Sequence, residues 1–287
     1  MATQKNNTTT AITLSPDTIT KTQLKQFWKE HGEAKVKQLT DKAQLCIYDA
    51  WEADSISTIL KLARKAFKIS PFCLDAYNLL AEYEAETYTI SKKLYEQAVY
   101  AGNILLKSEL ENDQGYFWGL LETRPYMRAL AGLANDHKQC GRLDKSIDIY
   151  QKMLVLNPND NQGIRYVLIF GLLEMHRLNE AQELLDDTGE ATAFCLYSAA
   201  LLAFLQDSPN KHAILQQAID SNLYIADKLK QLDDLSFRIE CFNAPLPDYY
   251  SMGSEEEATI YISDNLRTWC QASGAIHWIQ EHNEFKL

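Results

Sequence analysis

Residues 127–160, MRALAGLANDHKQCGRLDKSIDIYQKMLVLNPND, decide the fold of this chain. Large apolar residues recur at helical spacing in two segments, at Leu130 and Leu133 and then at Leu143, Ile147, Tyr150 and Leu154. Gly141 separates the segments, and glycine adopts the left-handed conformation that ends a helix at low cost. Pro158 follows the second segment, where its missing N–H stops a helix. The stretch therefore predicts two antiparallel helices joined by a tight turn.

The same stretch resembles the tetratricopeptide repeat (TPR), a helix–turn–helix unit of about 34 residues that ends in a proline. The positions that match the repeat are Leu130, Leu133, Ala134, Gly141, Leu143, Tyr150, Leu156 and Pro158. Ser146, Met153 and His137 depart from it, because they replace two usual alanines and an aromatic residue. We expect these three positions to adjust the packing and to leave the fold unchanged.

Four further helical pairs are predicted at about the same period, over residues 40–73, 74–107, 161–185 and 191–221. Residues 108–124 interrupt the period, and insertions in repeat arrays lie in loops on one face, frequently the binding face. The predicted fold class is all-α: a right-handed α-solenoid of TPR-like helical pairs followed by C-terminal capping helices. The predicted organisation is a flexible tail over 1–20, a repeat array over 21–222 and a helical cap over 223–287.

The C-terminal region is predicted to leave the repeat period. Residues 223–232 have the pattern of a lone helix, and residues 242–247 (FNAPLP) are predicted to be irregular. Ser254 is predicted to cap a helix that runs to about residue 271, with Glu257 reaching back to form a capping box. The order GSEEEA at 253–258, then Trp269, then GAI at 274–276 resembles the tail of TPR-like proteins of the suppression-of-tumorigenicity type.

Composition and charge favour a folded, soluble, cytoplasmic protein. Of the 287 residues, 46 % are hydrophobic, which is ample for a core. No apolar run reaches the roughly 18 residues of a membrane span, and no apolar signal region is present at the N-terminus. The net charge of −11 is concentrated in residues 126–287, with 13 Lys+Arg and 23 Asp+Glu, against 15 and 16 in residues 1–125. Because an acidic surface repels phosphates, we expect neither a nucleic acid nor a membrane as partner.

No catalytic, metal-binding or cofactor-binding motif is apparent. The cysteines lack CxxC pairs and zinc spacing, and we expect them to be reduced thiols: Cys46, Cys73, Cys140, Cys195, Cys241 and Cys270. His277 and His282 are five residues apart and lack the glutamate of a metalloprotease helix. No glycine-rich phosphate loop or nucleophile elbow occurs. We therefore expect a protein that is not an enzyme and takes no cofactor, although a site assembled from distant residues would escape such a search.

The TPR resemblance implies that the first helix of each pair lines a concave groove. The candidate partner-binding residues in that groove are Asn78, Glu82, Arg128, Asn135, Lys138, Gln162, Arg165 and Tyr166. Arg128, Asn135, Lys138 and Arg165 would form a locally positive strip that can bond a peptide backbone or carboxylate. Asn135 matches one asparagine of the carboxylate clamp found in some TPR proteins, but Ala131 replaces its lysine, which disfavours that clamp.

Two functions from different classes remain open at the level of the sequence. The first is a non-catalytic scaffold that binds a peptide or helix of a partner protein in the groove. The second is a self-associating scaffold that forms a dimer through its convex face or through its aromatic C-terminal helices, with Trp269 and Trp278. In solution we expect a monomer or a weak homodimer. A bacterial protein delivered into a host cell is a further alternative, suggested by the lysines, asparagines and threonines of the N-terminal tail.

Overall fold

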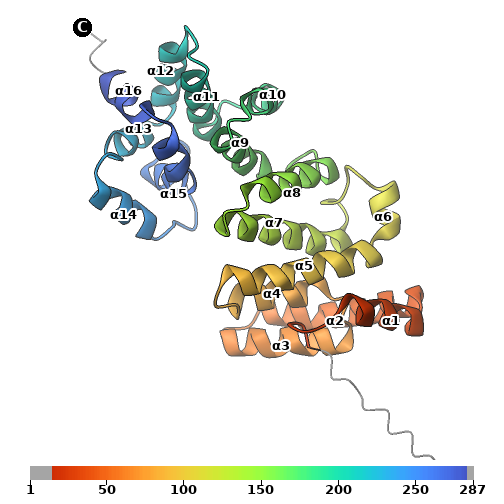
Figure 1. Ribbon diagram of the computed structural model, residues 1–287. Helices are drawn as coiled ribbons and strands as arrows, with labels where there is room; N and C mark the ends of the chain where they lie inside the picture. Colours follow the sequence, from red (N-terminus) through yellow and green to blue (C-terminus); the bar gives the residue numbers. More distant parts are fainter. Residues whose placement is uncertain (1–14, 283–287) are drawn as a thin grey trace, which may run out of the picture. The chain divides into compact units, whose positions relative to one another are not determined.

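The computed structural model describes residues 15–282, and within that range the chain forms helices joined by turns, with no strand (Figure 1). It divides into two compact units, Met1–Asn159 (unit 1) and Asp160–Leu287 (unit 2). The all-helical prediction is confirmed. No helix in the described part of the chain is both long enough and apolar enough to cross a membrane.

Unit 1 consists of a first helix and three helical pairs. Helix α1 (Lys21–His31) precedes the pairs, which are α2 (Glu33–Trp51) with α3 (Ile56–Ile69), α4 (Leu74–Tyr83) with α5 (Tyr88–Leu105), and α7 (Arg124–Gln139) with α8 (Leu143–Leu156). The two helices of each pair pack on each other, and successive pairs pack through α3 and α4 and through α5 and α7. The first helices of the pairs also pack in series, α2 on α4 and α4 on α7.

The stretch from which the fold was inferred forms α7, a tight turn and α8. Gly141 has a positive φ of 72°, as the turn requires, and the N–H of Arg142 donates to the carbonyl of His137. Ile147 and Tyr150 are buried on the face of α8 that packs on α7. Pro125 lies in the first turn of α7, where its missing N–H leaves no helical bond unmade.

Glycines allow α5 and α7 to approach closely. A Cβ on Gly102 of α5 would lie 2.4 Å from Cδ2 of Tyr126, which is fully buried on α7. A Cβ on Gly132 of α7 would lie 2.3 Å from Cζ of Tyr95 on α5. Each glycine therefore leaves space for an aromatic ring of the opposite helix.

The break in the repeat period contains two short helices, α6 (Lys107–Asn112) and η1 (Leu121–Thr123). The backbone N–H groups of Gly115 and Phe117 both donate to the carbonyl of Leu156, each at 3.1 Å, and the Phe117 side chain is fully buried. The insertion is therefore fixed to the C-terminal end of α8.

Unit 2 begins with two helical pairs, α9 (Ile164–Glu174) with α10 (Leu178–Thr188) and α11 (Ala193–Leu205) with α12 (Lys211–Ser221). Four helices follow: α13 (Leu223–Lys230), α14 (Leu235–Asn243), α15 (Glu255–Gln271) and α16 (Ala275–His282). Of these four, α13 and α15 match the helices predicted at 223–232 and from Ser254 to about residue 271, whereas α14 was not predicted. The irregular stretch expected at 242–247 begins only at Ala244, because residues 242 and 243 form the end of α14. At the other end of α14, Asp234 caps the helix by accepting a hydrogen bond from the N–H of Ser236.

Helix α15 packs across the first helices of both pairs in unit 2. Its Tyr261 is fully buried, with ring centroids 5.7 Å from Phe170 on α9 and 5.4 Å from Phe194 on α11. Ser254 caps α15 by accepting from the N–H of Glu257, as predicted. The Glu257 carboxylate reaches back to the N–H of Gly253 at 2.7 Å, one residue earlier than a capping box requires.

Of the tail predicted over residues 1–20, residues 1–14 lie outside the described residues. Ile19 is buried, and its carbonyl accepts from the side-chain amide of Gln97 on α5. Thr20 and Gln23 form a capping box at the start of α1. The first helix starts at Lys21, whereas Ile19, inside the predicted tail, is already packed against unit 1.

Candidate functional site

The candidate site is a pocket of about 760 Å³ in unit 1, within the size range of ligand-binding clefts. It lies over one face of α2, the first turns of α4 and α7, and the α6–η1 insertion. The residues that line it are Lys37, Thr40, Asp41, Gln44, Tyr48, Trp51, Phe72, Leu74, Leu105, Leu106, Glu109, Leu121, Glu122, Arg124, Pro125 and Arg128. We call this feature the unit 1 pocket.

A buried carboxylate fixes one side of the pocket. Asp75 on α4 is 1 % exposed, and Arg128 of α7 binds it bidentately, with Nε 2.9 Å from Oδ1 and Nη2 2.6 Å from Oδ2. The side-chain amides of Gln44 on α2 and Asn78 on α4 also donate to this carboxylate, each at 3.0 Å. Charge-assisted bonds of this geometry hold both partners firmly. Asp75 thus joins the first helices of three successive pairs.

Two aromatic side chains of α2 are exposed beside this ion pair. Tyr48 and Trp51 are each 49 % exposed, and their ring centroids are 5.7 Å apart. The guanidinium carbon of Arg128 lies 5.2 Å from the Trp51 ring centroid, within the range of a cation–π contact. The bidentate bond to Asp75 and this contact orient Arg128, and they leave Trp51 as a large amphipathic surface for a ligand.

The charged residues of the pocket balance one another. Three are basic, Lys37, Arg124 and Arg128, and three are acidic, Asp41, Glu109 and Glu122. The ammonium of Lys37 lies 3.2 Å from Glu33 and 3.5 Å from Glu109, and the hydrogen bond to Glu33 is the main cause that raises the pKa of Lys37. The pocket therefore presents aromatic and apolar surface without a strong net charge.

Of the predicted groove residues in unit 1, only Arg128 lines the pocket. Asn78 is buried, and its amide donates to Asp75 and to the carbonyl of Pro125, so it connects α4 to α7. Glu82 and Asn135 are exposed and Lys138 is half-buried, all away from the pocket lining. The sequence pattern therefore identified Arg128 of the pocket lining but did not identify its exposed aromatic residues, Tyr48 and Trp51.

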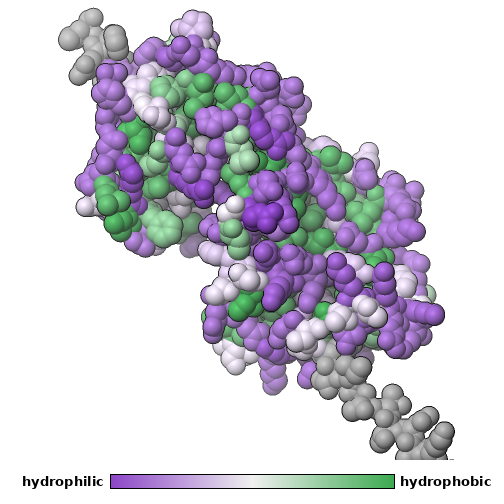
Figure 2. All heavy atoms as spheres, in the orientation of Figure 1, coloured by the Kyte–Doolittle hydropathy of each residue, from purple (hydrophilic) through white to green (hydrophobic). Residues whose placement is uncertain are grey.

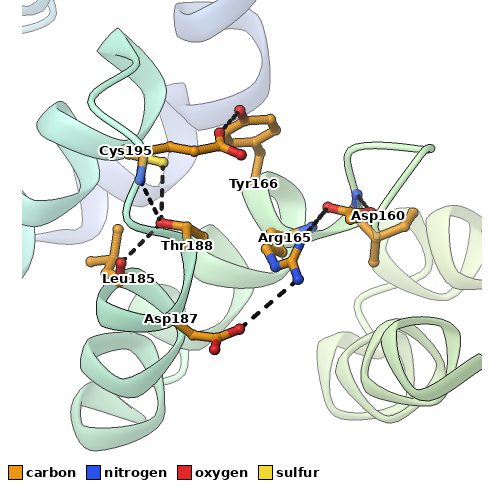
Figure 3. Close-up of polar contacts among 9 residues, drawn as sticks. Asp160, Arg165, Tyr166, Leu185, Asp187, Thr188 and Cys195 are labelled. Carbon is orange, nitrogen blue, oxygen red and sulfur yellow. Dashed lines mark hydrogen bonds and ion pairs between the residues drawn. The ribbon is translucent and has the colours of Figure 1, made fainter. Parts of the chain in front are cut away.

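The predicted groove residues of unit 2 lie on or just before α9 (Figure 3). Arg165 lies between two carboxylates, with guanidinium nitrogens 3.9 Å from Asp160 and 3.9 Å from Asp187. The Tyr166 hydroxyl donates to Glu190 at 2.5 Å, and burial, followed by this bond, raises the pKa of Tyr166. Gln162 is half-buried in the turn before α9.

The surface of unit 2 that corresponds to the pocket is covered by the chain itself. Helix α15 packs on α9, and Arg267 of α15 lies 2.8 Å from Glu174 at the end of α9. Ile169 on α9 is 1 % exposed. The α9 residues therefore contribute to packing and ion pairing within unit 2, and the described open pocket belongs to unit 1.

The locally positive strip expected from the sequence is largely neutralised. Arg128 is paired with Asp75, and Arg165 lies between Asp160 and Asp187. The two arginines also belong to different units. A sequence pattern identifies the arginines but not the carboxylates that the fold brings to them, since Asp75 is 53 residues from Arg128.

The tryptophans considered for a dimer surface are buried within unit 2. Trp269 is fully buried, and its Nε1 donates to the hydroxyl of Tyr261 at 2.8 Å. Trp278 is 6 % exposed and stacks on Phe204, with ring centroids 5.0 Å apart. Neither indole presents an area large enough to anchor a second copy.

The cysteines and other potential ligands add no second candidate. All six cysteines are free, as the sequence predicts, and burial raises the pKa of the fully buried Cys73, which keeps it a thiol. Among residues 15–282, no group of three or more His, Cys, Asp or Glu side chains is placed to hold a metal ion.

Comparison with known proteins gives a remote similarity to one type of protein. Suppressor of tumorigenicity 7 protein-like from Bos taurus is 23 % identical over 258 residues, which is 80 % of this chain and 45 % of the relative. The human protein of the same name is 22 % identical over 258 residues, covering 80 % and 43 %, and that of Gallus gallus is 23 % identical over 261 residues, covering 79 % and 44 %. The chain spans about half the length of the curated relatives it matches. No family model and no solved structure matches it.

Proposed function

We propose that this chain is a non-catalytic, cytoplasmic interaction module, built as a right-handed α-solenoid of TPR-like helical pairs, which binds a peptide or helix of a partner protein in the unit 1 pocket. The observation that carries the proposal is the exposed aromatic surface of Trp51 and Tyr48 beside the anchored guanidinium of Arg128. Trp, Tyr and Arg are the residue types that contribute most energy at interfaces.

The position of the pocket supports a protein partner. It lies over α2, α4 and α7, the first helices of three pairs, and in the TPR arrangement first helices line the binding groove. The α6–η1 insertion contributes Glu109, Leu121 and Glu122 to the lining, as expected of an insertion on a binding face. The similarity to suppressor of tumorigenicity 7-like proteins agrees with a helical repeat protein.

The balanced charge of the lining indicates the kind of segment that fits. A pocket with three basic and three acidic residues around aromatic and leucine side chains favours a segment that inserts an apolar side chain and has little net charge. Unit 2 provides an intramolecular precedent, because α15 lies across α9 and α11 and inserts Tyr261 between Phe170 and Phe194. We therefore propose a short amphipathic segment with an apolar or aromatic anchor.

A display selection with random dodecapeptides tests this function. Peptides selected on the whole chain are expected to share an apolar anchor, and Trp51→Ala is expected to weaken their binding at least about tenfold, the loss typical of an interface hot spot. Tyr88→Ala on α5 is the matched control, because Tyr88 is 52 % exposed and lies outside the pocket. Failure to select a common peptide, or equal losses in the two variants, would contradict the proposal.

A further inference from the structure

A second apolar surface lies on α14, the helix that the sequence did not predict. Leu235, Ile239 and Phe242 are 66 %, 54 % and 81 % exposed. Their spacing of i, i+4 and i+7 places them on one face of the helix. Figure 2 shows hydrophobic surface at the place where Figure 1 draws α14. We call these three residues the α14 face.

The opposite face of α14 accounts for the packing of this helix in unit 2. Phe237 and Cys241 are half-buried on this face, and α14 packs against α15. Arg238 is also half-buried but borders the α14 face, because it follows Leu235 by three residues and precedes Phe242 by four. Nε of Arg238 donates to the carbonyl of Leu232, which directs this cation toward the protein. Since packing within unit 2 uses only the inner face, the folded chain leaves the outer apolar face unoccupied. An apolar stripe of this kind on a helix suits a second helix laid against it.

The charge around the α14 face restricts the partner. Residues 233–248 contain the exposed carboxylates Asp233, Asp234, Glu240 and Asp248, and Arg238 is their only basic residue. An isologous dimer through this face would bring these carboxylates against their own copies, which repel. Anionic lipid headgroups would be repelled in the same way. A helix with lysine or arginine residues beside its apolar stripe is attracted.

We infer that the α14 face is a docking surface for a basic amphipathic helix of a partner protein. The apolar side chains of that helix pack on Leu235, Ile239 and Phe242, and its lysines or arginines are attracted by the exposed carboxylates of residues 233–248. This surface is separate from the unit 1 pocket and does not depend on the function proposed for the pocket. The chain would then contact partners through two surfaces of different chemistry, one balanced in charge and one acidic.

Binding of a synthetic helix tests the inference. The probe is a labelled peptide of sequence LKKLLKLLKKLLKL, and the control is its acidic counterpart LEELLELLEELLEL. By fluorescence anisotropy, the basic peptide is expected to bind the whole chain, more weakly as salt is raised, and the acidic peptide is not. Phe242→Ser and Ile239→Ser are each expected to weaken binding at least about tenfold.

Matched variants distinguish binding at the α14 face from nonspecific attraction of a basic peptide to an acidic protein. Val155→Ser on α8 alters another exposed apolar residue, 58 % exposed, and is expected to leave binding unchanged. Glu240→Lys is expected to weaken binding of the basic peptide. In the wild-type protein, the peptide should slow amide exchange over residues 235–246, a readout that does not depend on how the variants fold.

Several results would overturn the inference. In the peptide experiments these are absence of binding, equal binding of the acidic peptide, equal losses in Val155→Ser and Phe242→Ser, and protection from exchange confined to other regions. Concentration-dependent dimerisation that Phe242→Ser abolishes would also overturn it, because the α14 face would then belong to a second copy. So would tighter binding to vesicles of phosphatidylserine and phosphatidylcholine than to the peptide.

Discussion

At the scale of single residues, Asp75 determines how the pocket is organised. Its buried carboxylate accepts from Arg128, Gln44 and Asn78, which come from three helices. Removing one partner of a buried ion pair lowers the free energy of unfolding by more than the intact pair adds to it. The reason is that the remaining buried groups lose their hydrogen bonds. The positions of the helices around the pocket therefore depend on Asp75, which is not part of the pocket lining.

Asp75→Ala is expected to lower the free energy of unfolding by about 2–4 kcal/mol, because Arg128, Gln44 and Asn78 lose their common acceptor. Urea denaturation of the wild type and the variant measures this difference in the free energy of unfolding. Arg64→Ala is the control, since Arg64 and its partner Glu84 have side chains 43 % and 35 % exposed, and its loss should remain within about 1 kcal/mol. If Asp75→Ala costs no more than Arg64→Ala, the Asp75 network does not hold the three helices together.

We expect His137 to make the stability of unit 1 depend on pH. Burial lowers its pKa, Lys92, Lys145 and Arg142 lower it further, and Glu96 opposes them. A histidine whose pKa is lower in the folded state than its unfolded value of about 6.5 favours folding above that value. Its contribution to stability is lost as the pH falls from about 6.5 through the lowered pKa.

His137→Phe is expected to remove this pH dependence and restore the aromatic residue usual at this repeat position. The difference in unfolding free energy, variant minus wild type, should rise as the pH is lowered from about 7.5 to about 5.5. Chemical denaturation at a series of pH values measures this difference. A difference that stays constant, or shrinks on acidification, would show that His137 is not destabilised by protonation.

At the scale of elements, the close approach of α5 and α7 depends on two glycines. A glycine in the middle of a helix normally costs about 1 kcal/mol relative to alanine. Gly102 and Gly132 carry this cost. Glycine is nevertheless required at both positions, because a Cβ would overlap a ring of the other helix, Tyr126 or Tyr95. The repeat pattern favours small residues at such crossings, but only the structure shows which ring fills each space.

Gly132→Ala is expected to destabilise the protein by about 1–3 kcal/mol, opposite in sign to the helix propensity, because its Cβ would overlap the Tyr95 ring. Thermal unfolding followed by circular dichroism measures the change. In a Tyr95→Leu background the same substitution should cost less, since the ring is absent. A stabilising effect in the wild-type background would mean that the two helices are not in close contact at this point.

How much of the fold follows from the sequence depends on burial. The helices with an inward apolar stripe and punctuating glycine or proline, such as α7 and α8, were predicted close to their observed ends. Helix α14 was missed because it buries none of its residues fully, so no inward apolar pattern marks it. The pocket was found only at Arg128, because Trp51, the last residue of α2, belongs to no sequence motif and only the structure shows that it is exposed. Hydrophobic patterns report what is buried, whereas binding sites depend on what is left exposed.

At the scale of the whole molecule, the two units use their first helices differently. In unit 1 these helices line an open pocket, and in unit 2 α15 packs on α9 and contacts α11 through the ring of Tyr261. Trp269 and Trp278 are buried, and residues 233–248 contain four exposed carboxylates, so we expect no self-association through these surfaces. We therefore propose other proteins as the partners of the unit 1 pocket and of the α14 face.

The isolated chain is accordingly expected to be a monomer. Light scattering at tens of micromolar should give a mass near 32.8 kDa, independent of concentration and salt. A mass that approaches twice this value as concentration rises would favour the self-associating scaffold. Repeating the measurement with Phe242→Ser would then show whether the α14 face is responsible.

The central claim is that unit 1 binds a partner segment through its pocket, and hydrogen exchange with and without a selected dodecapeptide tests it most directly. The account predicts slower amide exchange over residues 37–51 and 121–128, which line the pocket, and loss of this protection in Trp51→Ala. Protection confined to unit 2, or unchanged exchange throughout unit 1 at saturating peptide, would contradict it.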